Sequence, residues 1–184
     1  MNKVIGISGT SGAGKTTLVQ ALSKNLNTAR LHWDDFDQVS QHPRNYLEWY
    51  DAGQDYREFD YSELANALKT LKLNQAYTHP ISNIIIKPTP IIFADLPLGR
   101  RHTQTERLVD LFIHVDVPLD IALCRRITRN PDVYNFEELE NYQSLRKLYI
   151  MEDVRESSDF ILDGKLKITD LVSEVGFILK RTFG

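Results

Sequence analysis

Cysteine is nearly absent from this sequence, since Cys124 is the only one among 184 residues. A lone thiol excludes an internal disulfide, and its scarcity favours a reducing compartment, so we expect a cytoplasmic protein. No apolar run approaches the roughly 20 residues that a membrane-spanning helix needs. The first residues also lack the apolar core of a signal peptide. The sequence therefore predicts no membrane partner.

A large excess of charge of either sign is also missing. The chain carries 22 Lys plus Arg against 25 Asp plus Glu, a formal net charge of -3. Such a balance does not favour binding to duplex DNA by bulk electrostatics, so any anion site must be local. We expect a small-molecule substrate and no nucleic-acid partner. The length predicts a single domain over residues 1–184, as a monomer or homodimer.

Patterns of strands and helices alternate along the chain. Apolar runs of strand length occur at residues 3–8, 90–94, 111–115 and 160–162, and crossovers between them are long enough for parallel pairing. We therefore expect an α/β three-layer sandwich with a mostly parallel central sheet. Further expected elements are helices at 16–26, 118–129, 136–156 and from 169, a short strand at 29–33, a small hairpin within 74–89, and a helix that begins with a capping box at Asp60 and Glu63.

The most specific pattern is a glycine-rich loop between the first strand and the first helix. Residues 9–16 match G-x-x-x-x-G-K-[ST] without a gap, in the strand–helix context that the motif requires. Its glycines bring backbone N–H groups toward an anion at the positive end of the helix. Lys15 would reach the β- and γ-phosphates of ATP, and the Thr16 hydroxyl would bind Mg²⁺. The expected nucleotide-binding residues are Gly9, Thr10, Ser11, Gly12, Ala13, Gly14, Lys15, Thr16 and Thr17.

Residues 7–18, together with the run Asp34-Asp35-Phe36, resemble the uridine kinase and nicotinamide riboside kinase group of P-loop kinases. The likeness extends to residues 118–129 and 159–164. It implies a P-loop NTPase fold and an ATP- and Mg²⁺-dependent transfer of phosphate to a hydroxyl of a small metabolite, with a nucleoside or ribosyl compound first among the substrates. One departure is Asp95-Leu96, where that group usually carries Glu-Gly.

The acidic run follows the second expected strand. In an open α/β sheet the carboxyl ends of the strands form the ligand crevice, where a carboxylate can orient a substrate hydroxyl and accept its proton. By resemblance Asp34 is the expected catalytic base, and Asp35 and Phe36 are expected beside the substrate. A solvated acidic turn is the alternative interpretation.

Asp95 follows an apolar strand, which is the context of a Walker-B-type carboxylate that holds Mg²⁺ through water. We expect Asp95 and Thr16 to form the metal site. The alternative is that Asp95 is only a turn residue at the end of a strand.

Three arginines lie near the end of the helix expected at 118–129. Cations are favoured there by the helix macrodipole alone, which is one interpretation. The resemblance implies the other, a lid over ATP at about residues 125–136. In that interpretation Arg125 and Arg129 stabilise the transferring phosphoryl group, and Arg126 contacts the nucleotide.

We expect residues at about 38–88 to form an insertion on the substrate side. The resembling nucleoside kinases place substrate contacts in a hairpin, which here would carry Tyr77 and His79. Arg100 and Arg101 follow Gly99 close to the predicted crevice, where either could contact substrate or phosphate. Arg100 is a further expected substrate contact, although surface solubility explains both arginines about as well.

Several functions remain open from the sequence. The first is the phosphotransferase described above. A kinase for a nucleotide or dephospho-coenzyme A is the alternative within kinases, and an ATP-binding or ATPase protein without a nucleoside acceptor is the alternative outside them. A GTPase-like switch would need N-K-x-D to read guanine, and no such tetrapeptide occurs.

Overall fold

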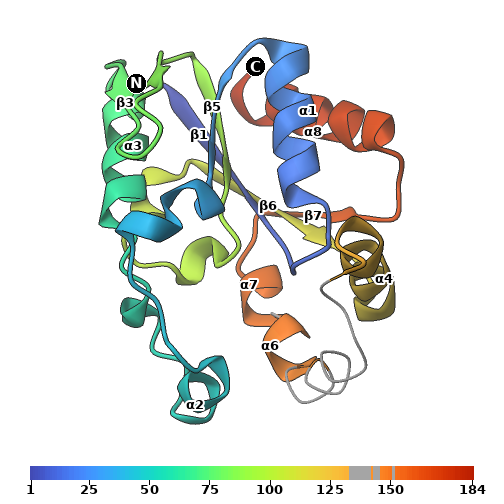
Figure 1. Ribbon diagram of the computed structural model, residues 1–184. Coiled ribbons are helices and arrows are strands. Elements are labelled where there is room, and N and C mark those ends of the chain that lie inside the picture. Colours follow the sequence, from blue (N-terminus) through green and yellow to red (C-terminus); the bar gives the residue numbers. More distant parts are fainter. Residues whose placement is uncertain (133–141, 143–145, 151) are drawn as a thin grey trace.

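A five-stranded sheet lies at the centre of the computed structural model, which describes residues 1–132, 142, 146–150 and 152–184. The strand order is β2-β5-β1-β6-β7 and every pairing is parallel (Figure 1). This confirms the expected α/β fold. The strands are β1 (Lys3–Ser8), β2 (Ala29–His32), β5 (Ile91–Asp95), β6 (Leu111–Asp116) and β7 (Phe160–Asp163).

Helices cover both faces of the sheet and complete three layers (Figure 1). Two of them, α1 (Lys15–Leu26) and α8 (Ile168–Phe183), pack on one face, and α3 (Ser62–Lys72) packs on the other. The remaining helices are α2 (Tyr46–Asp51), α4 (Leu119–Arg129), α6 (Arg146–Ile150) and α7 (Glu152–Glu156), with 3₁₀ turns η1 (Trp33–Val39), η2 (Tyr56–Glu58), η3 (Gly99–Arg101) and η4 (Glu106–Leu108).

Two hydrophobic cores form because successive side chains of a strand point to opposite faces of the sheet. In β1, Val4 belongs to the core under α3, whereas Ile5 and Ile7 belong to the core under α1 and α8. In β6, Phe112 and Ile113 divide in the same way. All five side chains are fully buried, so the continuous apolar runs read from the sequence are the central strands.

The expected hairpin is present as β3 (Tyr77–Thr78) paired antiparallel with β4 (Ile85–Ile86). The expected capping box is wrong. Helix α3 begins at Ser62, and the Asp60 carboxylate accepts from the Ser62 and Gln104 nitrogens at 3.2 and 2.8 Å. Glu63 accepts a 3.1 Å hydrogen bond from the Tyr77 hydroxyl and so serves the hairpin instead of the helix end.

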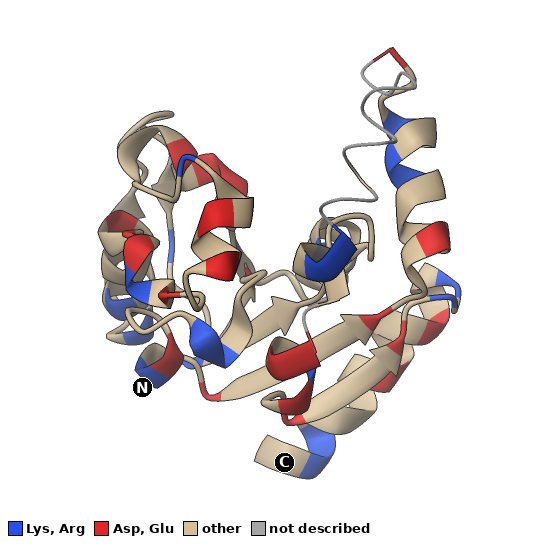
Figure 2. Ribbon diagram, turned by 90° about the horizontal axis from the view of Figure 1, so that it is seen from below, with Lys and Arg blue, Asp and Glu red and all other residues tan. Residues whose placement is uncertain are grey.

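The helix expected at 136–156 falls partly outside the described residues, which omit 133–141, 143–145 and 151. In its described part the chain forms the short helices α6 and α7. Over the described ranges no helix has both the length and the apolar character needed to cross a membrane. Figure 2 shows basic and acidic residues interspersed along the ribbon, in agreement with the small net charge.

Candidate active site

The glycine-rich loop joins β1 to α1 at the carboxyl edge of the sheet. Gly9, Gly12 and Gly14 have φ values of 141°, 89° and 103°, a region that side chains rarely allow. A Cβ at Gly9 would lie 2.6 Å from the Val115 carbonyl oxygen, and one at Gly12 would collide with the Ala122 carbonyl oxygen. At Gly9 and Gly12 glycine is therefore required sterically as well as conformationally, because β6 and α4 pack against the loop.

Lys15 folds back over this loop. Its Nζ donates a 3.1 Å hydrogen bond to the Thr10 carbonyl oxygen. Desolvation lowers the pKa of Lys15, while the carboxylates of Asp95 and Asp34 oppose that effect. Phosphate oxygens bound in the loop would therefore bring negative charge next to an ammonium group that is desolvated.

Thr16 and Asp95 meet beside the loop. The Thr16 hydroxyl donates a 2.6 Å hydrogen bond to Asp95 Oδ2, and Asp95 is 5% exposed. Its other oxygen, Oδ1, is buried without a hydrogen-bond partner among the described residues. A buried carboxylate oxygen with an unused lone pair, next to a hydroxyl, suits a hard cation such as Mg²⁺. The residues present therefore fit the metal that the motif implies.

Asp34 is the second residue of the turn η1, which begins at Trp33 directly after strand β2, and its side chain lines the same cavity as the loop. Desolvation raises the pKa of the Asp34 carboxyl, and the charges of Asp95 and Asp37 raise it further, against Lys15. Asp37 also lines the cavity and accepts a 2.6 Å hydrogen bond from the Tyr61 hydroxyl. A carboxylate with a raised pKa in a cleft is suited to accept a proton.

The cavity has a volume of about 1020 Å³ and extends well beyond the loop. A second part of its wall is aromatic and comes from η1, α2, η2 and the residues just before α3. The aromatic residues are Trp33, Tyr46, Trp49, Tyr50, Tyr56, Phe59 and Tyr61. One continuous space thus joins the phosphate-binding loop to a surface suited to a flat ring.

The three expected arginines have different surroundings. Arg125 and Arg129 line the cavity. Arg125 donates from its two terminal nitrogens to the carbonyl oxygens of Ala13, at 3.2 Å, and Gly164, at 2.8 Å, so it braces the loop backbone. Arg126 is not among the lining residues, and its guanidinium lies 5.7 Å over the Tyr142 ring. The part of the expected lid at 133–136 lies outside the described residues.

The structure corrects the expectation that Phe36, Tyr77 and His79 contact substrate. All three are buried, and the Phe36 ring lies 4.7 Å from the His79 ring and 6.4 Å from the Tyr77 ring, centroid to centroid. None of them lines the cavity. Phe36, from η1, and Tyr77, from the hairpin, belong to the core under α3, and His79 packs against the Phe36 ring, so the burial of aromatic area stabilises all three away from the cavity.

Asp35 and Arg100 are also placed differently from the expectation. The Asp35 side chain is exposed and does not line the cavity. Arg100 forms a 2.5 Å ion pair with Asp159 and lies 5.1 Å over the Phe112 ring, away from the cavity wall. The Arg100 guanidinium is therefore engaged in contacts within the fold.

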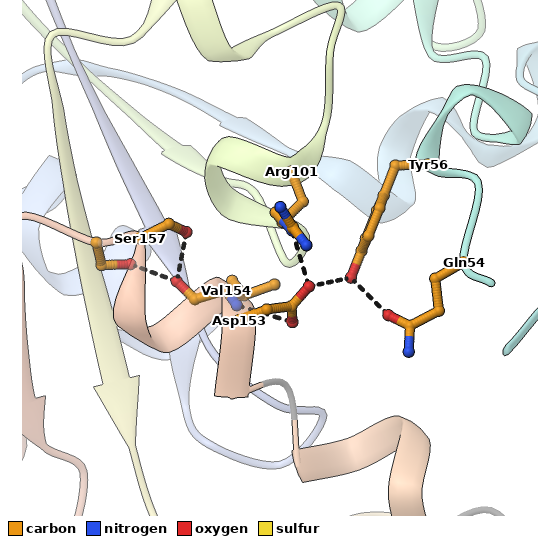
Figure 3. Close-up of polar contacts among 7 residues, drawn as sticks. Gln54, Tyr56, Arg101, Asp153, Val154 and Ser157 are labelled. Atoms are coloured by element: carbon orange, nitrogen blue, oxygen red, sulfur yellow. Dashed lines mark hydrogen bonds and ion pairs between the residues drawn. The ribbon is translucent and has the colours of Figure 1, made fainter.

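Sequence reasoning missed a polar corner of the cavity. Asp153 Oδ2 accepts from Arg101 Nε at 2.8 Å and from the Tyr56 hydroxyl at 2.9 Å, and Gln54 lies next to the tyrosine (Figure 3). These residues come from three segments far apart in the chain. Two signals were present in the sequence: Arg101 follows Arg100 close to the predicted crevice, and residues 38–58 are polar and aromatic with no helical or strand period.

Comparison with known proteins gives sequence relatives over most of the chain. A family model described as an AAA domain matches residues 5–159. The uridine kinase of Borrelia duttonii (strain Ly) is 35% identical over 141 residues, which cover 71% of this chain and 68% of that protein. The uridine kinase of Staphylococcus aureus (strain JH9) is 27% identical and covers 94% of this chain and 87% of its own length.

Solved structures resemble the fold at lower sequence identity. A shikimate kinase from Acinetobacter baumannii in complex with shikimate has a TM-score of 0.58 at 16% identity, covering 100% of this chain and 97% of that one. The protein TT1252 from Thermus thermophilus has a TM-score of 0.58 at 21% identity, with both chains fully covered. These solved structures therefore resemble this chain in fold over its whole length.

Proposed function

Because the chain belongs to the uridine kinase-like P-loop kinases, which are ATP-dependent small-molecule kinases, we propose that it transfers the γ-phosphoryl group of ATP to a hydroxyl of a nucleoside or ribosyl compound, with Mg²⁺ as cofactor. One observation carries the proposal. A phosphate-binding loop with Lys15, a Thr16–Asp95 pair and the carboxylate of Asp34 all face a single cavity that is also lined by aromatic rings.

The loop would hold the nucleotide. Its backbone N–H groups and the N-terminal end of α1 cradle the phosphates, and Lys15 moves from the Thr10 carbonyl oxygen to the β- and γ-phosphates. Arg129 lines the cavity and supplies a second cation for the transferring group. Arg125 acts indirectly in this scheme, because its guanidinium keeps Ala13 in place.

Thr16 and Asp95 would hold Mg²⁺, the first through its hydroxyl and the second directly or through water. The metal supplies charge neutralisation on the β- and γ-phosphates when bound. Asp95 takes this role in place of the Glu that the resembling kinases usually carry, and its unpartnered Oδ1 supports the assignment.

Asp34 would orient the acceptor hydroxyl and take its proton as the phosphoryl group transfers. Its raised pKa brings the carboxyl closer to the working pH than an ordinary aspartate, which favours proton transfer. Asp37 is less suited to be the base, because one of its oxygens already accepts from Tyr61. We assign catalysis to the cytoplasm, in keeping with the lone, exposed Cys124.

The charged residues of the cavity wall favour an uncharged acceptor over a nucleotide or dephospho-coenzyme A. Besides the metal-side Asp95, the acids Asp34, Asp37, Glu152 and Asp153 line the described cavity, and the cations Arg101 and Lys147 that line it near α6 and α7 are ion-paired with Asp153 and Asp51. A phosphate on the acceptor would therefore compete with carboxylates for these two cations, whereas a nucleoside would present only a flat ring and hydroxyls.

An acceptor screen tests the proposal. Purified protein is supplied with MgATP and with nucleosides, vitamins or mononucleotides, and ADP release is followed together with the mass of the product. We expect a phosphorylated nucleoside, and we expect Lys15→Ala to abolish its formation while the far-ultraviolet circular dichroism stays unchanged. ADP release that no acceptor accelerates would instead identify an ATPase.

A further inference from the structure

Three distant segments of the chain meet at one carboxylate oxygen in the cavity wall. Asp153 Oδ2, on α7, accepts from Arg101 Nε of η3 and from the Tyr56 hydroxyl of η2 (Figure 3). All three side chains line the cavity. Neither phosphate binding, nor the metal pair, nor the base uses any of them.

The bonding in this corner leaves polar groups available for a ligand. The Tyr56 hydroxyl has a single proton, which serves Asp153 at 2.9 Å in preference to Gln54 Oε1 at 3.3 Å. Arg101 is bound to Asp153 through Nε, so its planar fork can still present its terminal N–H groups to the cavity. Its guanidinium carbon lies 5.4 Å from the centre of the Tyr56 ring, which restricts how the fork is oriented.

The charges of the corner cancel. Arg101 and Asp153 neutralise each other, and the nearby Lys147 is ion-paired with Asp51. An anionic group of the acceptor at Arg101 would lie beside the Asp153 carboxylate, which already compensates the arginine charge, and the cavity wall also carries Glu152. A neutral group with both hydrogen-bond donors and acceptors meets no such cost.

The surroundings of the corner are flat and apolar. The Trp49 ring stands at 88° to the Tyr56 ring with centroids 5.2 Å apart, and it stands at 86° to the Phe59 ring at 5.3 Å. The Trp49 indole N–H is already used, since it donates to the Asp55 carbonyl oxygen at 3.0 Å. The aromatic walls therefore contribute packing, and hydrogen-bonding selectivity falls to the corner.

We propose that Arg101 and Asp153 form a specificity pair that recognises the hydrogen-bonding edge of an uncharged planar ring in the acceptor, while Asp34 serves the hydroxyl that is phosphorylated. Arg101 donates to a ring carbonyl oxygen, and Asp153 accepts from a ring or exocyclic N–H. This inference rests on the proposed function, because it assigns the acceptor ring to the same cavity.

Three acceptors test the pair. They are uridine, the C-phenyl riboside that keeps the ribose but has no polar ring edge, and shikimate, an alcohol that carries a carboxylate. For the native enzyme we expect kcat/KM for uridine to exceed that for the phenyl riboside by roughly 10- to 100-fold, and shikimate to be unreactive. In Arg101→Met and Asp153→Asn we expect this ratio to fall to within about threefold of unity, with an unchanged KM for ATP.

Arg107→Met is the matched control, because Arg107 is 92% exposed at its side chain and lies outside the cavity wall. It removes the same charge and should leave the ratio intact. Arg101→Lys keeps the ion pair with Asp153 but not the fork, so it provides a folded test if Arg101→Met is unstable. We expect its ratio to fall as well.

Equal loss of activity toward both ribosides in the Arg101 and Asp153 variants would overturn the inference, since it would show that the ion pair only stabilises the structure of the cavity wall. An unchanged ratio, or a native preference for shikimate, would overturn it too. Failure of the proposed function looks different, because the native enzyme would then phosphorylate neither riboside and the ratio would not exist.

Discussion

The Thr16 hydroxyl donates a 2.6 Å hydrogen bond to Asp95 Oδ2, which ties the first turn of α1 to the end of β5. The two residues lie 79 positions apart in the chain. Strand β5 pairs directly with β1, so the register of the sheet brings Asp95 beside the loop that β1 feeds. The pair is thus positioned by the central strands and not by a mobile connection.

Metal dependence tests this pair. Asp95→Asn removes the charge and keeps the size, so we expect the Mg²⁺ concentration for half-maximal activity to rise by roughly 10- to 100-fold, the usual cost of losing a metal-supporting group. The measurement is a MgCl₂ titration of activity at fixed ATP. Asp170→Asn, an exposed aspartate in α8, is the control and should titrate like the native enzyme. An unshifted titration of Asp95→Asn would remove Asp95 from the metal site.

The features that could be predicted from the sequence are those set by residues close together in the chain. The loop over residues 9–16 has fixed spacing, so its glycines and Lys15 were identified before any tertiary contact was known. The central strands were equally predictable, because both of their faces are buried and each gives a continuous apolar run. Asp95 followed, since it comes at the carboxyl end of such a run, whereas Asp34 was assigned as the base by the resemblance to the uridine kinase group.

Side-chain direction and long-range pairing were not predictable in the same way. In the hairpin, alternation decides which residues face the core, and a shift of one position would have reversed Tyr77. Arg101 and Asp153 belong to no motif, and they meet only because η3 and α7 pack together. Arg100 and Arg101 are equivalent as sequence, yet the first is bound to Asp159 and the second lines the cavity.

The pH dependence of turnover should report on Asp34. A general base works only when deprotonated, so activity rises with pH through its pKa, which desolvation and the charges of Asp95 and Asp37 raise above 3.8. Asp37→Asn removes one of these charges while keeping an oxygen for Tyr61. We therefore expect the acidic limb of the profile of kcat/KM against pH to move to lower pH. A limb that stays in place or moves upward would contradict the assignment.

His114 should make stability depend on pH. It is 3% exposed and lies 3.1 Å from the Ser8 hydroxyl, and burial lowers its pKa from 6.5 to about 4. Between these values the unfolded chain binds a proton that the folded chain does not, so the free energy of unfolding falls as pH drops. From 6.5 to 4 the loss amounts to at most about 3 kcal/mol.

Urea unfolding at pH 7 and at pH 5 measures this dependence. The His114→Asn variant keeps a polar side chain toward Ser8 but does not titrate. We expect the drop in unfolding free energy between the two pH values to be smaller in the variant than in the native protein. Equal drops would mean that other groups produce the acid sensitivity.

The central claim is that Asp34 is the base of a phosphoryl transfer whose nucleotide is held elsewhere in the cavity. Its most direct test is a paired measurement on Asp34→Asn, of kcat with the nucleoside found in the screen and of the Kd for MgATP. We predict that kcat falls by roughly 10²- to 10⁴-fold, the worth of a positioned general base, while the Kd for MgATP barely changes. Near-normal turnover, or a loss of ATP affinity that accounts for the lost activity, would contradict this account.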